Sequence, residues 1–159
     1  MKFNDLKLRL LGLYPPFLGA GISARRVPNG WESNLRLSLL NRNYFGTHFG
    51  GSLYAMCDPF FALILAERLG PGYVVWDKAA TIRFLRPGRG RVTARFEIEP
   101  ERVDAIRRQV ERDGKCEPAF DARVLDQAGL VVAEVDKLLY VRLRDRPSGF
   151  QPDVTAPSP

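Results

Sequence analysis

The chain has 159 residues, of which 45% are hydrophobic and 26% charged, as in a globular domain built on one core. Two cysteines exclude a disulfide framework and favour a reducing, cytoplasmic compartment, while a single histidine among scattered carboxylates predicts no metal site. The net charge of +6 suits an anionic partner, but no zinc-finger spacing, RNA-binding aromatic motif or basic helix accompanies it, so no nucleic-acid partner is expected.

The first residues predict an amphipathic helix. Phe3, Leu6, Leu10 and Leu13 recur at i, i+3, i+7 and i+10, which favours packing on the domain over a membrane-surface anchor. Charged side chains interrupt the stretch, so a secretory signal is not expected there, and no segment reaches the roughly 18 apolar residues of a membrane span.

Two further segments follow in chain order. Residues 31–39, WESNLRLSL, alternate apolar and polar side chains and predict a half-buried strand. Residues 53–66, LYAMCDPFFALILA, have no polar face and are rich in Leu, Ala and Met, which predicts a helix buried on nearly all sides.

Four strands in two hairpins are expected next. Residues 73–87 and 91–99 flank the turn-forming PGRG and indicate a first hairpin. A short amphipathic helix is expected from Pro100 to Gly114, and residues 118–126 and 130–143 then indicate a second hairpin.

The element order predicts an α+β fold in one domain, residues 1–143 including the N-terminal helical segment. In this fold a curved antiparallel sheet wraps around a long central apolar helix. Residues 144–159 are rich in proline and are expected to form a loosely ordered tail. The sheet would have an open edge and the helix an uncovered side, which a second copy of the chain would protect.

Asp58 is the only acidic residue between Leu53 and Ala66. Burying it unpaired is costly, so a raised pKa or a supplied partner would make it a functional candidate. The alternative is a helix cap, because Asp followed by Pro59 matches an N-cap and a first-turn proline. If residues 52–57 are helical instead, Pro59 kinks the helix near the Ala55 carbonyl.

A glycine-rich loop, FGTHFGGS, runs into this helix. Its unpaired backbone N–H groups could hold a carbonyl oxygen or an anion, although glycines before a helix are more often turn residues. The sequence lacks the Gly-Lys-Ser/Thr end of a Walker loop.

The stretches NRNYFGTHFGGSLYAMCDP, VVWDKAATIRFLRPGRGRV and DKLLYVRL resemble the hot-dog thioesterase superfamily, in particular its poorly characterised branch of tetrameric acyl-CoA thioesterases. The resemblance covers residues 31–143. It implies an enzyme that hydrolyses acyl-CoA or a related thioester, with coenzyme A present as part of the substrate and no separate cofactor. It also implies a homodimer or dimer of dimers with an active site shared between two chains.

The family pattern of Asn, then His-Gly-Gly, then a helix acid can be placed residue by residue. The resemblance assigns the acid to Asp58 as general base or nucleophile, and the asparagine to Asn43, which would orient water or substrate. It assigns the backbone N–H that binds the thioester carbonyl to Gly50, with Gly51 as its neighbour. The histidine position holds Phe49, and His48 lies one residue earlier.

Substrate binding is expected at His48, Phe49, Arg83 and Arg86, with Arg89 and Arg91 as further candidates for the carrier phosphates or as a solvated basic turn. Cys57 is a weak nucleophile candidate, because an apolar helix raises the pKa of a thiol.

Helical geometry separates Gly51 and Asp58 by about 10 Å along the axis, too far to serve one reacting atom in one chain. The rival hypothesis is a non-catalytic acyl-ligand-binding or interaction module of the same fold, in which Asp58 caps a helix.

Overall fold

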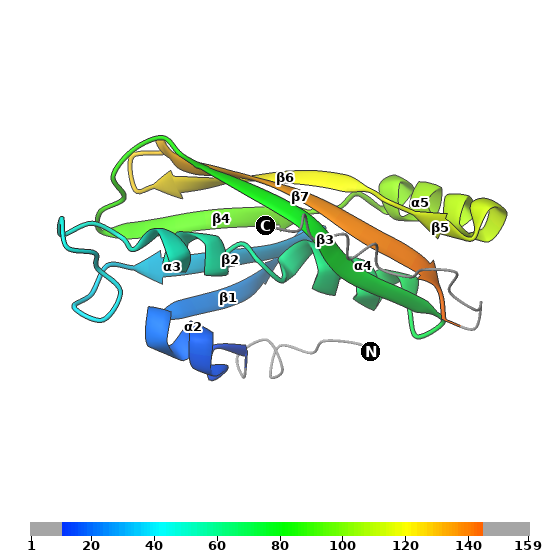
Figure 1. The fold of residues 1–159 in the computed structure, drawn as a ribbon, viewed down its shortest axis with the longest axis horizontal. Coiled ribbons are helices and arrows are strands. Elements are labelled where there is room, and N and C mark those ends of the chain that lie inside the picture. Colours follow the sequence, from blue (N-terminus) through cyan, green and yellow to red (C-terminus); the bar gives the residue numbers. More distant parts are fainter. Residues whose placement is uncertain (1–10, 145–159) are drawn as a thin grey trace, which may run out of the picture.

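Within residues 11–144, which the computed structural model describes, the strands form a single antiparallel sheet (Figure 1). The strands are β1 (Ile22–Val27), β2 (Gly30–Arg36), β3 (Tyr73–Phe84), β4 (Arg91–Glu97), β5 (Lys115–Cys116), β6 (Ala119–Asp126) and β7 (Val131–Leu143). Their order across the sheet is β1-β2-β4-β6-β7-β3, and β5 pairs with β7. Of the expected helical stripe, Phe3, Leu6 and Leu10 lie outside the described residues, as does the tail from residue 145. Leu13 is described, but it lies in a turn and is 62% exposed, so the expected packing of the stripe does not extend to it.

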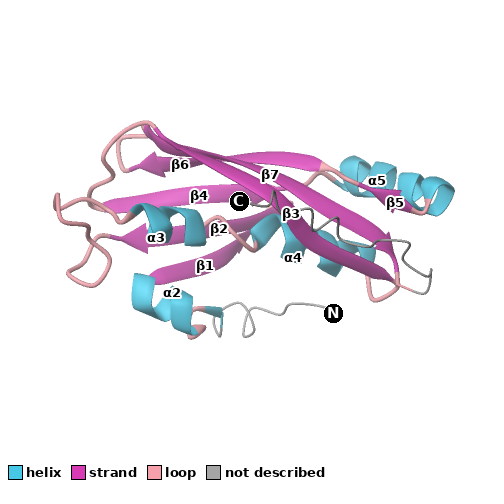
Figure 2. Cartoon of the chain, in the orientation of Figure 1, coloured by secondary structure: helices cyan, strands magenta, loops and turns pink. Residues whose placement is uncertain are grey.

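The helices are α2 (Pro15–Ala20), α3 (Gly50–Ala55), α4 (Phe60–Leu69) and α5 (Pro100–Asp113) among the described residues. The long strands curve around α3 and α4, so the predicted α+β architecture of a curved antiparallel sheet around a central helical segment is confirmed (Figure 2). No described helix has both the length and the apolar character that crossing a membrane requires.

The core lies between α4 and the concave face of the sheet. The ring of Phe60 stacks on Phe96 with centroids 4.7 Å apart and meets the edge of Trp31 at 5.9 Å. Offset and edge-to-face pairs of this kind add to the free energy that burying the rings contributes. Ile64 and Leu65 of α4 are also buried, whereas the opposite side of the helix is only half-buried.

The prediction of a first hairpin from residues 73–87 and 91–99 is wrong. Strands β3 and β4 exist, but β3 pairs with β7 at the edge of the sheet and β4 lies between β2 and β6. The reason lies in the connecting residues 85–90. Leu85 and Arg86 donate their N–H groups to the Val132 carbonyl, and the Gly88 carbonyl accepts the N–H of His48. The connection is therefore bound to β7 and to the loop before α3, and does not close a tight turn.

The remaining predicted elements are present, although some of their ends differ from the prediction. The hairpin of β6 and β7 and the helix from Pro100 are confirmed, and Gly114 ends that helix with φ 81°. The predicted strand 31–39 ends earlier, at Arg36, and the following leucines lie in a loop. Strand β1 was not predicted, because its sequence ISARRV does not alternate regularly.

The central helical segment is divided between Met56 and Pro59. The Met56 carbonyl accepts a hydrogen bond of 2.7 Å from the buried Ser33 hydroxyl, and the Asp58 N–H reaches the Ala55 carbonyl at 3.4 Å. Helix α4 starts at Phe60, has Pro59 at its N-cap position, and makes no side-chain cap hydrogen bond. The interpretation of Asp58 as a side-chain cap is therefore wrong.

Candidate functional site

Asp58 belongs to a cluster of charged and polar groups around a buried lysine. Lys137 Nζ lies 3.0 Å from Asp58 Oδ1, 3.1 Å from Asp77 Oδ2 and 3.3 Å from the Tyr54 hydroxyl. The side chain of Lys137 has no exposed surface, whereas that of Asp58 is 47% exposed. We call Lys137, Asp58, Asp77 and Tyr54 the Lys137 cluster.

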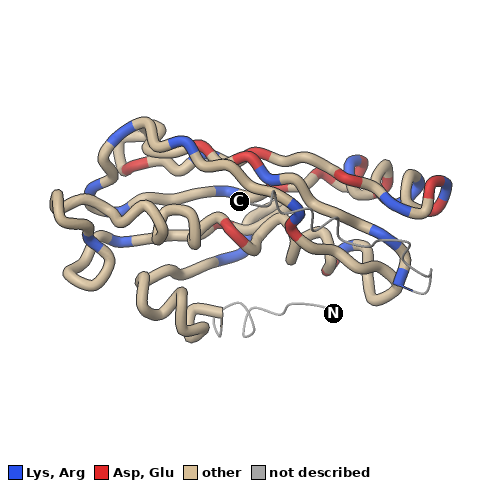
Figure 3. The backbone as a smooth tube through the Cα atoms, viewed as in Figure 1, with Lys and Arg blue, Asp and Glu red and all other residues tan. Residues whose placement is uncertain are grey.

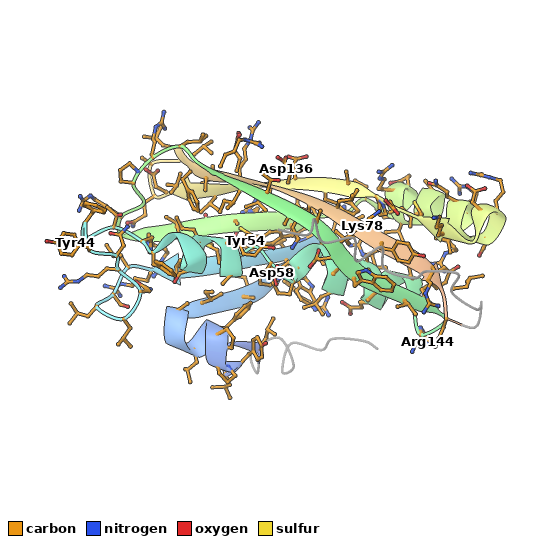
Figure 4. The ribbon with its side chains drawn as sticks, in the orientation of Figure 1. Tyr44, Tyr54, Asp58, Lys78, Asp136 and Arg144 are labelled. Atoms are coloured by element: carbon orange, nitrogen blue, oxygen red, sulfur yellow. The ribbon has the colours of Figure 1, made fainter. Side chains whose placement is uncertain are left out.

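Four elements bring the cluster together. Lys137 takes an inward position of β7, in step with the buried Val135 and Leu139, because alternate residues of a strand face the same side. Asp77 lies on β3 where the pairing with β7 shifts register before Ala79. Tyr54 comes from α3 and Asp58 from the turn before α4, and both appear beside the middle of the sheet in Figure 4.

Opposite charges stabilise the buried ammonium. Burial lowers the pKa of Lys137, but the pairing with Asp58 and Asp77 outweighs burial and raises it above the usual value. Burial raises the pKa of Asp77, and Lys137 opposes that shift. The pKa of Tyr54 is also raised, mainly by burial, so its phenol stays neutral. One ammonium facing two carboxylates leaves an excess negative charge when both are ionised, and Asp58 is the more exposed of the two.

Cys57, next to Asp58 in the chain, does not take part as a nucleophile. Burial raises the pKa of its thiol to about 12. A thiol with such a pKa has almost no thiolate at neutral pH.

A pocket of about 530 Å³ lies at the start of α3. It combines apolar side chains with polar groups and arginines from two connections, and its lining is Asn43, Phe45, Thr47, His48, Gly50, Leu53, Phe84, Leu85, Arg86, Pro87, Gly88 and Arg89. This mixture could accept an acyl group together with an anionic group.

Gly50 and Gly51 form the first turn of α3. Phe49 precedes them with φ −63° and ψ 130°, and the helix bonds begin with the N–H groups of Ser52 and Leu53. The N–H groups of Gly50 and Gly51 have no acceptor among the described residues, as expected at a helix start. A Cβ on Gly50 would lie 3.0 Å from the Phe84 ring, so the side chain must be small there.

Asn43 and His48 hold the loop that precedes α3. The amide oxygen of Asn43 accepts the N–H groups of Phe45 at 3.0 Å and Thr47 at 3.1 Å, and its nitrogen donates to the Thr47 hydroxyl at 2.9 Å. His48 is buried, and its Nε2 lies 3.1 Å from the Gly90 carbonyl, to which the neutral ring donates. Burial lowers the pKa of His48, and Nδ1 has no partner among the described residues.

The remaining expected binding residues lie in different environments. Arg86 and Arg89 line the pocket, and Arg89 Nη1 is 3.4 Å from the Gly46 carbonyl. Arg83 is paired instead with Glu134 at 3.3 Å and with Asp136 on β7. Phe49 is exposed and is not part of the pocket lining.

The structure thus forms two groups from the expected site residues. Asn43, His48, Gly50 and Arg86 meet at the pocket, while Asp58 belongs to the Lys137 cluster, no member of which lines that pocket. Lys137, Asp77 and Tyr54 were not predicted. The sequence did contain an indication of Lys137, because a lone charged residue at an inward-facing strand position needs a buried partner of opposite charge.

A family model described as a domain of unknown function, DUF4442, matches residues 5–141. No curated protein matches the chain.

Solved structures share the fold at low sequence identity. The Pseudomonas aeruginosa protein PA5026, described as a protein of unknown function and probable thioesterase, has 22% identity and a TM-score of 0.79, covering 90% of this chain and 98% of that one. The Haemophilus influenzae thioesterase HI1161 has 16% identity and a TM-score of 0.69, covering 92% and 95%. The Escherichia coli PaaI protein of the phenylacetic acid degradation operon has 19% identity and a TM-score of 0.60, covering 85% and 90%. These likenesses show that the chain has the hot-dog fold of such thioesterases.

Proposed function

The chain belongs to the DUF4442 family, and we propose that it hydrolyses acyl-CoA or a related acyl thioester at a site shared between two chains. The observation that carries this proposal is the Asp58 carboxylate, which a buried ammonium fixes through one oxygen while 47% of the side chain stays exposed. A carboxylate in this position is oriented and still accessible to water or substrate. The likeness to thioesterases of the same fold supports the choice of reaction.

Hydrolysis of a thioester needs an activated water and a donor for the carbonyl oxygen. Asp58 would take a proton from water as it attacks the acyl carbon, or would attack that carbon itself and form an anhydride that water then opens. In either course the C–S bond breaks and the thiol leaves with a proton. The free N–H of Gly50 would donate to the carbonyl oxygen, whose negative charge grows in the transition state.

The proposed site needs two chains because one chain keeps these groups apart. Gly50 lines the pocket, whereas Asp58 belongs to the Lys137 cluster. Strand β3 supplies Asp77 to this cluster and forms the outer edge of the sheet, where its free backbone groups can pair with a second copy. A two-fold dimer through that edge, or a dimer of such dimers, would place each cluster beside the partner chain.

Arg86 and Arg89 would bind the phosphates of the acyl carrier. Both line the pocket, and neither forms an ion pair with a carboxylate among residues 11–144. Arg83 fits this role less well, because Glu134 and Asp136 already neutralise it.

A hydrolysis assay over a series of acyl-CoA chain lengths tests the proposal. Asp58→Asn removes the base or nucleophile but keeps the shape, so kcat/KM should fall by roughly 100-fold or more. Asp104→Asn, an exposed carboxylate on α5, is the matched control and should leave the rate unchanged. Equal rates for Asp58→Asn and the parent would remove Asp58 from the chemistry.

A second candidate function is acyl-ligand binding without hydrolysis. It is favoured by Phe49, which stands exposed at the family's histidine position, and by His48, whose ring is buried and bound to the Gly90 carbonyl. Calorimetric binding of acyl-CoA with no turnover by the parent chain would favour this function over the first.

A further inference from the structure

The loop between β2 and α3 holds apolar side chains out in water. Leu39, Leu40, Tyr44 and Phe45 are each between 77% and 97% exposed, and among the described residues no other large apolar side chain is as exposed. Figure 4 shows Tyr44 at the extreme end of the molecule, well away from Asp58. A patch of this kind at the end of a domain marks an interaction surface.

Two asparagines, the buried Asn41 and the half-buried Asn43, hold this loop in its conformation. Asn41 Nδ2 donates to the Ala20 carbonyl at 2.7 Å and to the Arg36 carbonyl at 2.8 Å, and its oxygen accepts the Ser38 N–H at 2.8 Å. Asn43 fixes the second half of the loop in the same way. The polar side chains therefore point inward and hold the backbone, while the leucines and aromatic rings point outward.

The same end of the molecule is strongly basic. Residues 33–57 and 79–96 contain several arginines and no Asp or Glu. Two of these arginines pair with acids, Arg83 with Glu134 and Asp136, and Arg95 with Glu32. No ion pair to a described residue is formed by Arg36, Arg42, Arg86, Arg89 and Arg91.

The segments that carry these arginines adjoin the apolar loop. The loop 37–49 and the connection 85–90 are joined by hydrogen bonds from Leu37 N–H to the Gly90 carbonyl and from Arg89 to the Gly46 carbonyl. Figure 3 shows basic positions at this end of the molecule, where the connection 85–90 carries Arg86 and Arg89 and the loop 37–49 carries Arg42. The nearby Asp126 is engaged in its own turn, where it accepts the N–H groups of Ala128 and Leu130.

We propose that this end surface, made of Leu39, Leu40, Tyr44, Phe45, Arg36, Arg42 and Arg91, docks on an anionic phospholipid bilayer. The leucines and aromatic rings would enter the boundary between headgroups and acyl chains, and the arginines would pair with lipid phosphates. Basic charge around exposed apolar side chains is the combination that binds such surfaces. The proposal does not depend on the hydrolase activity.

Other occupants fit the surface less well. A second copy of the chain in a two-fold contact would place unpaired arginines against unpaired arginines, which repel when no carboxylate lies between them. A nucleic acid would use the arginines and the aromatic rings, but would leave the aliphatic Leu39 and Leu40 exposed to water.

Co-sedimentation with vesicles tests the proposal. The parent protein should sediment with phosphatidylcholine vesicles that contain phosphatidylglycerol and stay in solution with phosphatidylcholine alone. Raising the salt to about 1 M, where the Debye length falls to about 3 Å, should release it. Arg42→Gln should weaken partitioning roughly fivefold, since each basic residue near the surface contributes by about that factor. The matched control, Arg108→Gln on α5, removes the same charge from the opposite end and should change partitioning much less.

A second measurement reports insertion separately from attraction by charge. Tyr44→Trp adds a third tryptophan at the most exposed position of the loop, and the emission that it adds to that of the parent should move to shorter wavelength when anionic vesicles are added. The double change Leu39→Ser with Leu40→Ser should abolish sedimentation without altering the molecular mass in solution. Absence of vesicle binding by the parent, or equal loss in Arg42→Gln and Arg108→Gln, would overturn the proposal. A change of oligomeric state in the leucine variant would also overturn it, because the patch would then be an interface between copies.

Discussion

Replacing Lys137 by methionine is expected to destabilise the fold strongly. Methionine keeps most of the length and volume of the buried stem, so the change removes mainly the ammonium. The carboxylates of Asp58 and Asp77 would then face each other without the cation that now lies 3.0 and 3.1 Å from them. The variant isolates the charge of the Lys137 cluster.

The size of the effect follows from burial. Removing one partner of a buried ion pair costs roughly 3–5 kcal/mol. The side chains of Asp58 and Asp77 are 47% and 27% exposed, so water relieves part of the repulsion and the lower end of that range applies. A loss of about 3 kcal/mol corresponds to a fall in Tm of roughly 6–12 °C for a chain of this length.

Urea denaturation followed by circular dichroism measures this loss. With a slope of about 2 kcal/mol per molar, the midpoint should fall by roughly 1.5 M. A triple variant that adds Asp58→Asn and Asp77→Asn removes the uncompensated charges and should recover much of the loss. A Lys137→Met variant within about 0.5 kcal/mol of the parent would show that the ammonium is not the buried counter-ion of these carboxylates.

Three further outcomes are expected. His48 is the only histidine, so its NMR titration is unambiguous, and its pKa should lie below 6.5 because the ring is buried. The folded state then loses stability as the pH falls from 6.5 towards that lower pKa. A pKa above 6.5 would contradict the burial of His48. Gly30→Ala should cost more than 2 kcal/mol, since its Cβ would lie 1.8 Å from the Phe96 carbonyl oxygen, whereas Gly19→Ala meets nothing within 4 Å and should not lower Tm. Cys57 should react with a thiol reagent only on unfolding, because its pKa is about 12, and rapid reaction of the native protein would refute its burial.

Local sequence rules predicted most elements but not all of their partners. Alternating side chains located β2 but not β1, and Pro100 and Gly114 marked the ends of α5. The pairing of β3 was predicted wrongly because a proline-glycine turn signal is local, while the partner of a strand depends on contacts far along the chain. Here the Val132 carbonyl binds the N–H groups of Leu85 and Arg86 and directs β3 to β7.

Asp58 was detectable from the sequence because it is the one acid in an apolar segment. Its partner was not, since Lys137 lies 79 residues later and is brought to it only by the curvature of the sheet. The glycine loop was placed correctly before a helix. The sequence could not show that Asn43 and His48 use their polar groups to hold this loop, so their expected roles towards substrate stay predictions.

Mixing two inactive variants tests the shared thioesterase site most directly. Gly50→Pro removes the N–H proposed to bind the carbonyl, and proline suits the first helical position after Phe49, which already has the extended geometry it requires. Because any Cβ at Gly50 lies 3.0 Å from the Phe84 ring, Gly50→Ala, which adds this contact but keeps the N–H, is the matched control and should stay active. Each of Gly50→Pro and Asp58→Asn alone should lose acyl-CoA hydrolysis. Chains mixed by unfolding and refolding together should recover roughly a quarter of the parent rate, since half the dimers are mixed and each holds one intact site. An active parent with no recovery in the mixture would place the site within one chain, and a parent that hydrolyses no acyl-CoA would contradict the proposed reaction.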